Sequence, residues 1–194
     1  MVRKLITLVL AALVLAACQK SETPGTPAQP RVAKKAKKVD PRTVVGTEVG
    51  NIMPAYTSQW LDGKPFDLAA EHGNVVFLNV WATWCGPCRS EMPFLQSMQD
   101  QYAARGLKVI GVSVDEGGVA GVKSFLTEKG IRYPSAIDAE GRIANLLETT
   151  VLPTSVLIDR TGHVAWKDAG MLRGPDPSLT KAIEQALAAK NSAR

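Results

Sequence analysis

The stretch Val75–Cys88, VVFLNVWATWCGPC, decides the fold of this chain. It opens with Val75–Trp81, an apolar run interrupted only by Asn79, as expected for a strand that is covered on both faces. Cys85 and Cys88 follow, with two residues between them. A C-x-x-C pair directly after a buried strand is typical of a redox-active dithiol.

The residues on either side of this stretch predict an α/β sandwich on a mixed sheet. Apolar residues at three- and four-residue steps predict a helix that follows Cys88 and ends at Arg105-Gly106. Leu107–Val114 has the pattern of a second buried strand, and a strand, helix and strand with short connections predict a parallel pair. The other expected elements are a hairpin over 58–68, a helix over 119–129, a short strand and short helix over 135–147, a hairpin over 154–167 and a last helix from 177.

Cys85 is the expected nucleophile of the pair. The thiolate is the attacking form, and a cysteine at a helix N-terminus is stabilised as a thiolate by unpaired N–H groups and the helix dipole. Cys88 is then close enough to resolve the mixed disulfide. A structural cross-link over so short a loop would remove little entropy from the unfolded chain. A zinc site would need two more ligands, and the chain offers His72, His163 and Cys18 for them. We therefore expect no metal, and no cofactor beyond the cysteine pair.

The cysteine motif and a proline loop together resemble the thioredoxin superfamily. The matching residues are Asn79–Cys88 and Val151-Leu152-Pro153-Thr154, which precedes the last long strand. The extra length around 119–147 resembles the TlpA/ResA-like branch of secreted thiol-disulfide oxidoreductases. The resemblance implies a thioredoxin-like fold with an N-terminal β-hairpin, a short insert and a cis-proline loop beside the cysteines. It also implies that substrate is contacted by Trp84, Gly86, Pro87, Leu152 and Pro153.

The chain departs from thioredoxin at the residue that assists proton transfer. Thioredoxin has a buried Asp six positions before the first cysteine, whereas this chain has Asn79, an amide that cannot act as a base. Glu91 is the expected replacement, because it lies on a neighbouring helix face to Cys88 and because Glu91-Met92-Pro93 is similar to the TlpA/ResA-like pattern. The alternative is a solvated glutamate in the first turns of a helix, where acidic residues are common.

The first residues of the chain predict export and a lipid anchor. Arg3-Lys4 precedes thirteen largely apolar residues, too few to span a bilayer comfortably. They end in Leu15-Ala16-Ala17-Cys18, which resembles a bacterial lipobox with Cys18 as the lipidated residue. An ordinary signal peptide with Cys18 inside it or nearby is the alternative. Gln19 favours the outer membrane if the host is Gram-negative.

Charge is distributed unevenly along the chain. The formal net charge is +5, but the fourteen basic and sixteen acidic residues from Gly46 onward give a net charge of −2. The basic excess therefore lies outside the folded domain, and nucleic-acid binding loses its main support. We expect a lipoprotein-type signal peptide over 1–17, a lipidated cysteine and disordered basic, Pro-rich tether over 18–45, and a thioredoxin-like domain over 46–194.

The same resemblance implies a reductant of protein disulfides that works in the periplasm or another extracytoplasmic space. Members of the branch reduce cysteines of apocytochrome c before haem attachment, or of copper-site proteins, and a transmembrane thiol transporter recharges them. The expected partners are therefore a disulfide-containing client, that transporter and the membrane, with no nucleic acid. A copper-binding or metallochaperone module, a peroxiredoxin-type thiol peroxidase and a pure scaffold remain alternatives, although the Pro-x-x-x-Thr-x-x-Cys setting of a peroxidatic cysteine is absent.

Overall fold

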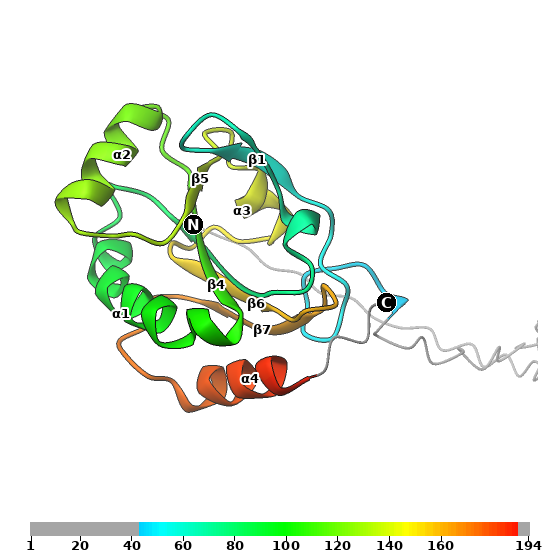
Figure 1. Cartoon of the computed structure of the whole chain (residues 1–194). Helices are drawn as coiled ribbons and strands as arrows, with labels where there is room; N and C mark the ends of the chain where they lie inside the picture. Colours follow the sequence, from blue (N-terminus) through cyan, green and yellow to red (C-terminus); the bar gives the residue numbers. More distant parts are fainter. Residues whose placement is uncertain (1–42, 190–194) are drawn as a thin grey trace, which may run out of the picture. The chain divides into compact units, whose positions relative to one another are not determined.

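The computed structural model describes residues 43–189, so the expected signal peptide, Cys18 and nearly all of the tether lie outside the described residues. Within this part, seven strands form one sheet in the order β2-β1-β5-β4-β3-β6-β7 (Figure 1). The strands β3 (Val75–Trp81), β4 (Leu107–Ser113) and β5 (Ser135–Ile137) are parallel, and β6 (Thr154–Ile158) is antiparallel to β3. The expected mixed sheet and its parallel pair are thereby confirmed.

Antiparallel strands close both edges of the sheet. At one edge, β1 (Thr57–Trp60) and β2 (Pro65–Asp67) form the expected hairpin, and β1 pairs with β5. At the other edge, β7 (Val164–Ala169) pairs with β6. The edge strand β2 has only three residues, which leaves little unpaired backbone for aggregation at that edge.

Helices cover the sheet unequally, as Figure 1 shows. The helices α1 (Gly86–Tyr102), α2 (Val119–Glu128) and α4 (Pro177–Ala188) share one face, where they pack against alternate residues of β3. The short α3 (Arg142–Leu146) packs on the opposite face, and two 3₁₀ segments, Leu68–Glu71 and Ala103–Arg105, complete the fold. Among residues 43–189, no helix is long and apolar enough to cross a bilayer.

The start of α1 differs from the prediction by a few residues. The helix begins at Gly86 rather than after Cys88, because Cys85 itself forms the N-cap and Pro87 is compatible with the first turn. All seven residues of β3 are buried, so the strand emerges from the core directly into this helix start. The carboxyl ends of β3 and β4 lie side by side, which is the edge where α/β sheets commonly place their functional sites.

Candidate active site

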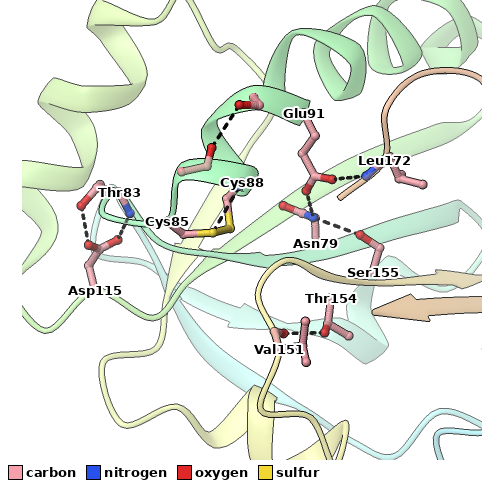
Figure 2. Close-up of a disulfide and its surroundings, with 12 residues drawn as sticks. Asn79, Thr83, Cys85, Cys88, Glu91, Asp115, Val151, Thr154, Ser155 and Leu172 are labelled. Carbon is pink, nitrogen blue, oxygen red and sulfur yellow. Dashed lines mark hydrogen bonds between the residues drawn. A yellow bond between two sulfur atoms is a disulfide. The ribbon is translucent and has the colours of Figure 1, made fainter. Parts of the chain in front are cut away.

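The cysteine pair lies at the N-terminus of α1, directly after β3 (Figure 2). Cys85 and Cys88 form a disulfide, with their Cα atoms 5.3 Å apart. The Cys85 sulfur accepts a hydrogen bond from the Cys88 backbone N–H at 3.2 Å. Cys85 is 5% exposed and Cys88 is 1% exposed, so an incoming thiol or disulfide reaches Cys85 first. When the disulfide opens, the Cys88 N–H and the dipole of α1 stabilise a Cys85 thiolate.

The predicted substrate-contact residues surround this pair. Trp84 is 69% exposed, an unusual degree for so large an apolar side chain, whereas Leu152 is half-buried against the cysteines. The peptide bond between Leu152 and Pro153 is cis, as the resemblance to thioredoxin implies. Trp84 and Leu152 both line a surface hollow of about 300 Å³. Gly86 is half-buried and Pro87 exposed in the first turn of α1.

The loop before the cis-proline is held by two threonine hydroxyls. The Thr154 hydroxyl donates to the Val151 carbonyl at 2.7 Å (Figure 2), and the Val151 N–H donates to the Thr149 hydroxyl at 3.1 Å. The two hydroxyls lie 2.9 Å apart. The loop backbone therefore has a defined shape beside the cysteines before any client is bound.

Glu91 lies buried between α1 and β3, so the alternative of a solvated glutamate is wrong. Its side chain is 1% exposed. One carboxylate oxygen accepts a hydrogen bond from Asn79 Nδ2 at 2.8 Å, and the other accepts one from the Leu172 backbone N–H at 2.9 Å (Figure 2). Asn79 Nδ2 also donates to the Ser155 hydroxyl at 3.0 Å. The structure thus brings the Glu91 carboxylate of α1 against Asn79 on β3, the position at which the acid was expected from the resemblance to thioredoxin.

Burial raises the pKa of Glu91 to about 7. Loss of solvation is the main cause, and the charge of Asp168 acts in the same direction. The hydrogen bonds from Leu172 and Asn79 act in the opposite direction and are outweighed. A carboxyl group with a pKa near neutrality can both accept and release a proton at physiological pH.

Comparison with known proteins agrees with this geometry. The family model described as Redoxin matches residues 48–183. The chain belongs to the Redoxin family. Over 117 residues it is 38% identical to the thiol-disulfide oxidoreductase ResA of Bacillus thuringiensis subsp. konkukian, an alignment that covers 60% of this chain and 67% of that relative. Within the Redoxin family it is therefore a ResA-like thiol-disulfide oxidoreductase.

Solved structures place this Redoxin domain in the thioredoxin-like fold. A crystal structure from Chlorobium tepidum, assigned as the thiol:disulfide interchange protein DsbE, matches with a TM-score of 0.66 and 30% identity over 75% of this chain and 100% of that chain. A secreted thiol-disulfide isomerase from Corynebacterium glutamicum matches with a TM-score of 0.60 and 28% identity, over 70% of this chain and 83% of that chain. The expected fold class is confirmed.

Asp115 lies in the site but was not among the predicted site residues. Its carboxylate accepts hydrogen bonds from the Thr83 N–H at 2.9 Å and the Thr83 hydroxyl at 2.5 Å (Figure 2). It also accepts one from the Ser113 hydroxyl at 2.6 Å. Thr83 lies two residues before Cys85, so Asp115 fixes the loop that leads from β3 to the cysteines. An acidic residue just after a buried parallel strand was the signal that could have identified it.

Ser155 and Leu172 were also absent from the predicted site. They lie 76 residues from Asn79 and 81 residues from Glu91, and no local pattern connects either pair. Among residues 43–189, no group of three or more His, Cys, Asp or Glu side chains is placed to hold a metal ion. The described site contains the disulfide and two buried carboxyl groups, those of Glu91 and Asp115.

Replacing Asp115 should loosen the loop before the cysteines. We expect Asp115→Ala to lower the free energy of unfolding by about 1–3 kcal/mol, because the donors of Thr83 and Ser113 lose their acceptor. Urea denaturation with the disulfide intact measures this loss. Glu116→Ala is the matched control, since the exposed neighbour should change stability by less than about 0.5 kcal/mol. Equal losses in the two variants would contradict the role of Asp115.

Glu91 should make the stability of the protein depend on pH. Its pKa is about 7 in the folded protein against an ordinary value of 4.5 for glutamate, so its stabilising contribution is complete below pH 4.5 and is lost as the pH rises through 7. The shift corresponds to at most about 3 kcal/mol. We expect wild type to lose stability relative to Glu91→Gln between pH 5 and pH 8 in urea denaturation, whereas Glu116→Gln should follow wild type. A constant difference between wild type and Glu91→Gln at both pH values would refute this.

Proposed function

We propose that this ResA-like oxidoreductase is a membrane-tethered, extracytoplasmic reductant of protein disulfides that works through Cys85 and Cys88. The observation that carries the proposal is a cysteine pair at a helix N-terminus with a buried carboxyl, Glu91, in the next turn of the same helix. Such an arrangement provides a nucleophile, a resolving thiol and a proton acceptor within two helical turns.

The first step of the proposed reaction forms a mixed disulfide. The Cys85 thiolate attacks one sulfur of the client disulfide, a bond forms between these two sulfurs, and the client S–S bond breaks. The second client sulfur leaves as a thiolate and takes a proton from solvent. Because Cys85 is the N-cap of α1, the helix N–H groups stabilise its thiolate before the attack.

The second step releases the reduced client. The Cys88 thiol gives its proton to the Glu91 carboxylate and attacks the Cys85 sulfur. The bond between Cys85 and the client breaks, and the departing client thiolate receives the proton from Glu91. The client gains two electrons and two protons, and Cys85 and Cys88 are left as the disulfide that the structure contains. A carboxyl with a pKa of about 7 supports this transfer in both directions.

We further propose that Trp84, Gly86, Pro87, Leu152 and Pro153 contact the client. Support comes from the high exposure of Trp84 and from the hollow that it shares with Leu152. The threonine bonds that hold the neighbouring Val151 backbone favour a preformed docking edge, which costs less ordering entropy when a client binds.

The clients that we propose are apocytochrome c or a copper-site protein, and the proposed electron source is a transmembrane thiol transporter. Lipidation of Cys18 and the tether up to residue 45 would keep the domain near the membrane, at the outer membrane if the host is Gram-negative. The composition of residues 1–18 supports this localisation. One of the similar structures is a secreted isomerase, which supports the proposal that this protein also acts outside the cytoplasm.

Trapping experiments test the proposed exchange. In the native host, Cys88→Ser should accumulate mixed disulfides with clients, because the resolving thiol is lost while Cys85 still attacks. Cys85→Ser is the matched control and should trap nothing. Mass spectrometry of the trapped adducts identifies the clients. Absence of any adduct on Cys85 would contradict the function, and a reduction potential near the value of about −120 mV of the oxidant DsbA would contradict the direction.

Thiol alkylation against pH tests the role of Glu91. We expect the alkylation rate of the reduced wild type to show an inflection near pH 7, because the charge of Glu91 affects the ionisation of the neighbouring thiols. Glu91→Gln should lack that inflection, whereas Glu116→Gln should keep it. Superimposable profiles for wild type and Glu91→Gln would remove Glu91 from the mechanism.

A further inference from the structure

Four buried polar atoms in the layer between the sheet and the helices α1 and α2 have no hydrogen-bond partner within the described part of the chain. They are Asn79 Oδ1, Trp81 Nε1, Tyr133 Oη and Ser135 Oγ. Their residues are at most 5% exposed. Because roughly 90% or more of buried polar groups in proteins are bonded to protein or to ordered water, unpaired atoms that lie together point to ordered water between them.

The strand register places three of these residues around one glycine. Asn79 is the ladder partner of Gly111, and Gly111 is the partner of Ser135, so the three form a row across β3, β4 and β5. Trp81 lies two residues beyond Asn79 and therefore on the same face of β3. A Cβ atom at Gly111 would lie 2.7 Å from Ser135 Oγ and 2.8 Å from Trp81 Nε1. Both polar atoms thus converge over the glycine.

The orientation of Asn79 turns its oxygen toward the same place. Asn79 Nδ2 donates to Glu91 and to Ser155, and Ser155 lies on β6, on the opposite side of β3 from Gly111. The amide oxygen therefore points away from Ser155, as Figure 2 shows. Exchanging the two ends of the amide would bring this oxygen against the Glu91 carboxylate, which is repulsive.

We propose that an ordered internal water molecule lies over Gly111, bonded to Asn79 Oδ1, Trp81 Nε1 and Ser135 Oγ, and that it holds Asn79 with its amide nitrogen toward Glu91. A water molecule has two donors and two acceptors. It donates to the Asn79 oxygen, accepts from the Trp81 indole N–H, and either donates to or accepts from the Ser135 hydroxyl. Internal waters typically make about three such bonds to groups that are otherwise unpaired.

Ser135, one of the proposed partners of this water, lies beside a surface hollow. Tyr133 and Ser135 line a surface hollow of about 400 Å³ next to the β1–β2 hairpin. Burial and the charge of Glu91 both raise the pKa of Tyr133. The hollow gives the internal water a route of exchange with solvent on the side of β5.

The water affects Glu91 through Asn79. Without a donor to its oxygen, the Asn79 amide gives a weaker hydrogen bond to the Glu91 carboxylate, and the protonated carboxyl is favoured. The other charged or titratable groups that face Glu91 are Asp168, Tyr133 and, in the reduced form, the two thiols. The consequence for disulfide exchange rests on the proposed role of Glu91, whereas the presence of the water does not.

A crystal structure at atomic resolution tests the site directly. We expect one ordered water at about 2.7–3.2 Å from Asn79 Oδ1, Trp81 Nε1 and Ser135 Oγ in the oxidised protein. A structure without this water, or with Asn79 Oδ1 bonded to another protein group, overturns the proposal.

The coupling to Glu91 is tested by carbon NMR of its carboxyl group in the oxidised protein. Ser135→Ala should raise the pKa of Glu91 by about half a unit to one unit, because the water loses one partner. Ser97→Ala, which removes an exposed hydroxyl bonded to the Phe94 carbonyl, is the matched control and should have no effect. In an Asn79→Ala background, Ser135→Ala should also have no effect.

An unchanged Glu91 titration in Ser135→Ala overturns the coupling. If that variant does not fold, Trp81→Phe removes the indole donor while it keeps an aromatic ring, and the same shift is expected. This titration needs no disulfide-exchange activity, so its outcome is independent of the trapping experiment on Cys88→Ser.

Discussion

The side-chain amide of Asn79 is the contact on which the arrangement of this site depends. Its nitrogen lies 2.8 Å from Glu91 on α1 and 3.0 Å from the Ser155 hydroxyl on β6. The second oxygen of Glu91 continues the connection to the Leu172 backbone, which follows β7. The central strand, the helix that carries the cysteines and the antiparallel side of the sheet are therefore fixed to one another by polar contacts inside an otherwise apolar layer. Removing one partner would leave a buried group unpaired, which costs free energy, so these contacts stabilise the arrangement.

The cysteines are held from a second side by Asp115. Its carboxylate fixes Thr83 and so determines the path of the chain from β3 into the N-cap of α1. The two acidic residues serve this site differently. Asp115 accepts three hydrogen bonds and anchors a loop. Glu91 accepts two hydrogen bonds that lower its pKa, but burial raises the pKa by more, to about 7. A fixed loop and a titratable carboxyl on opposite sides of the disulfide suit a reaction in which sulfur atoms must stay aligned while a proton moves.

Local sequence patterns were sufficient for the parts of the site that depend on neighbouring residues. The buried strand Val75–Trp81, the helix after it and the position of Glu91 one turn beyond Cys88 follow from periodicity and spacing. The contacts of Thr83 with Asp115, Asn79 with Ser155 and Glu91 with Leu172 could not be predicted, because each joins residues more than thirty positions apart. The burial of Glu91 was equally inaccessible to periodicity, since a glutamate in the first turns of a helix is exposed unless another segment covers it. Here the segment at Leu172, far along the chain, does so.

Asn79 stands where thioredoxin has a buried aspartate, and an amide at this position is compatible with a buried Glu91 beside it. Two carboxyl groups in the same buried layer would repel each other, and one would have to remain protonated. An amide at position 79 avoids this conflict, because it donates to Glu91 instead of competing with it for protons. The proposed proton acceptor therefore lies on the helix rather than on the sheet. Since the N-terminus of that helix also favours a Cys85 thiolate, the proposed proton acceptor and the proposed nucleophile belong to one rigid element. Their spacing then depends on helical geometry rather than on how the helix packs against the strand.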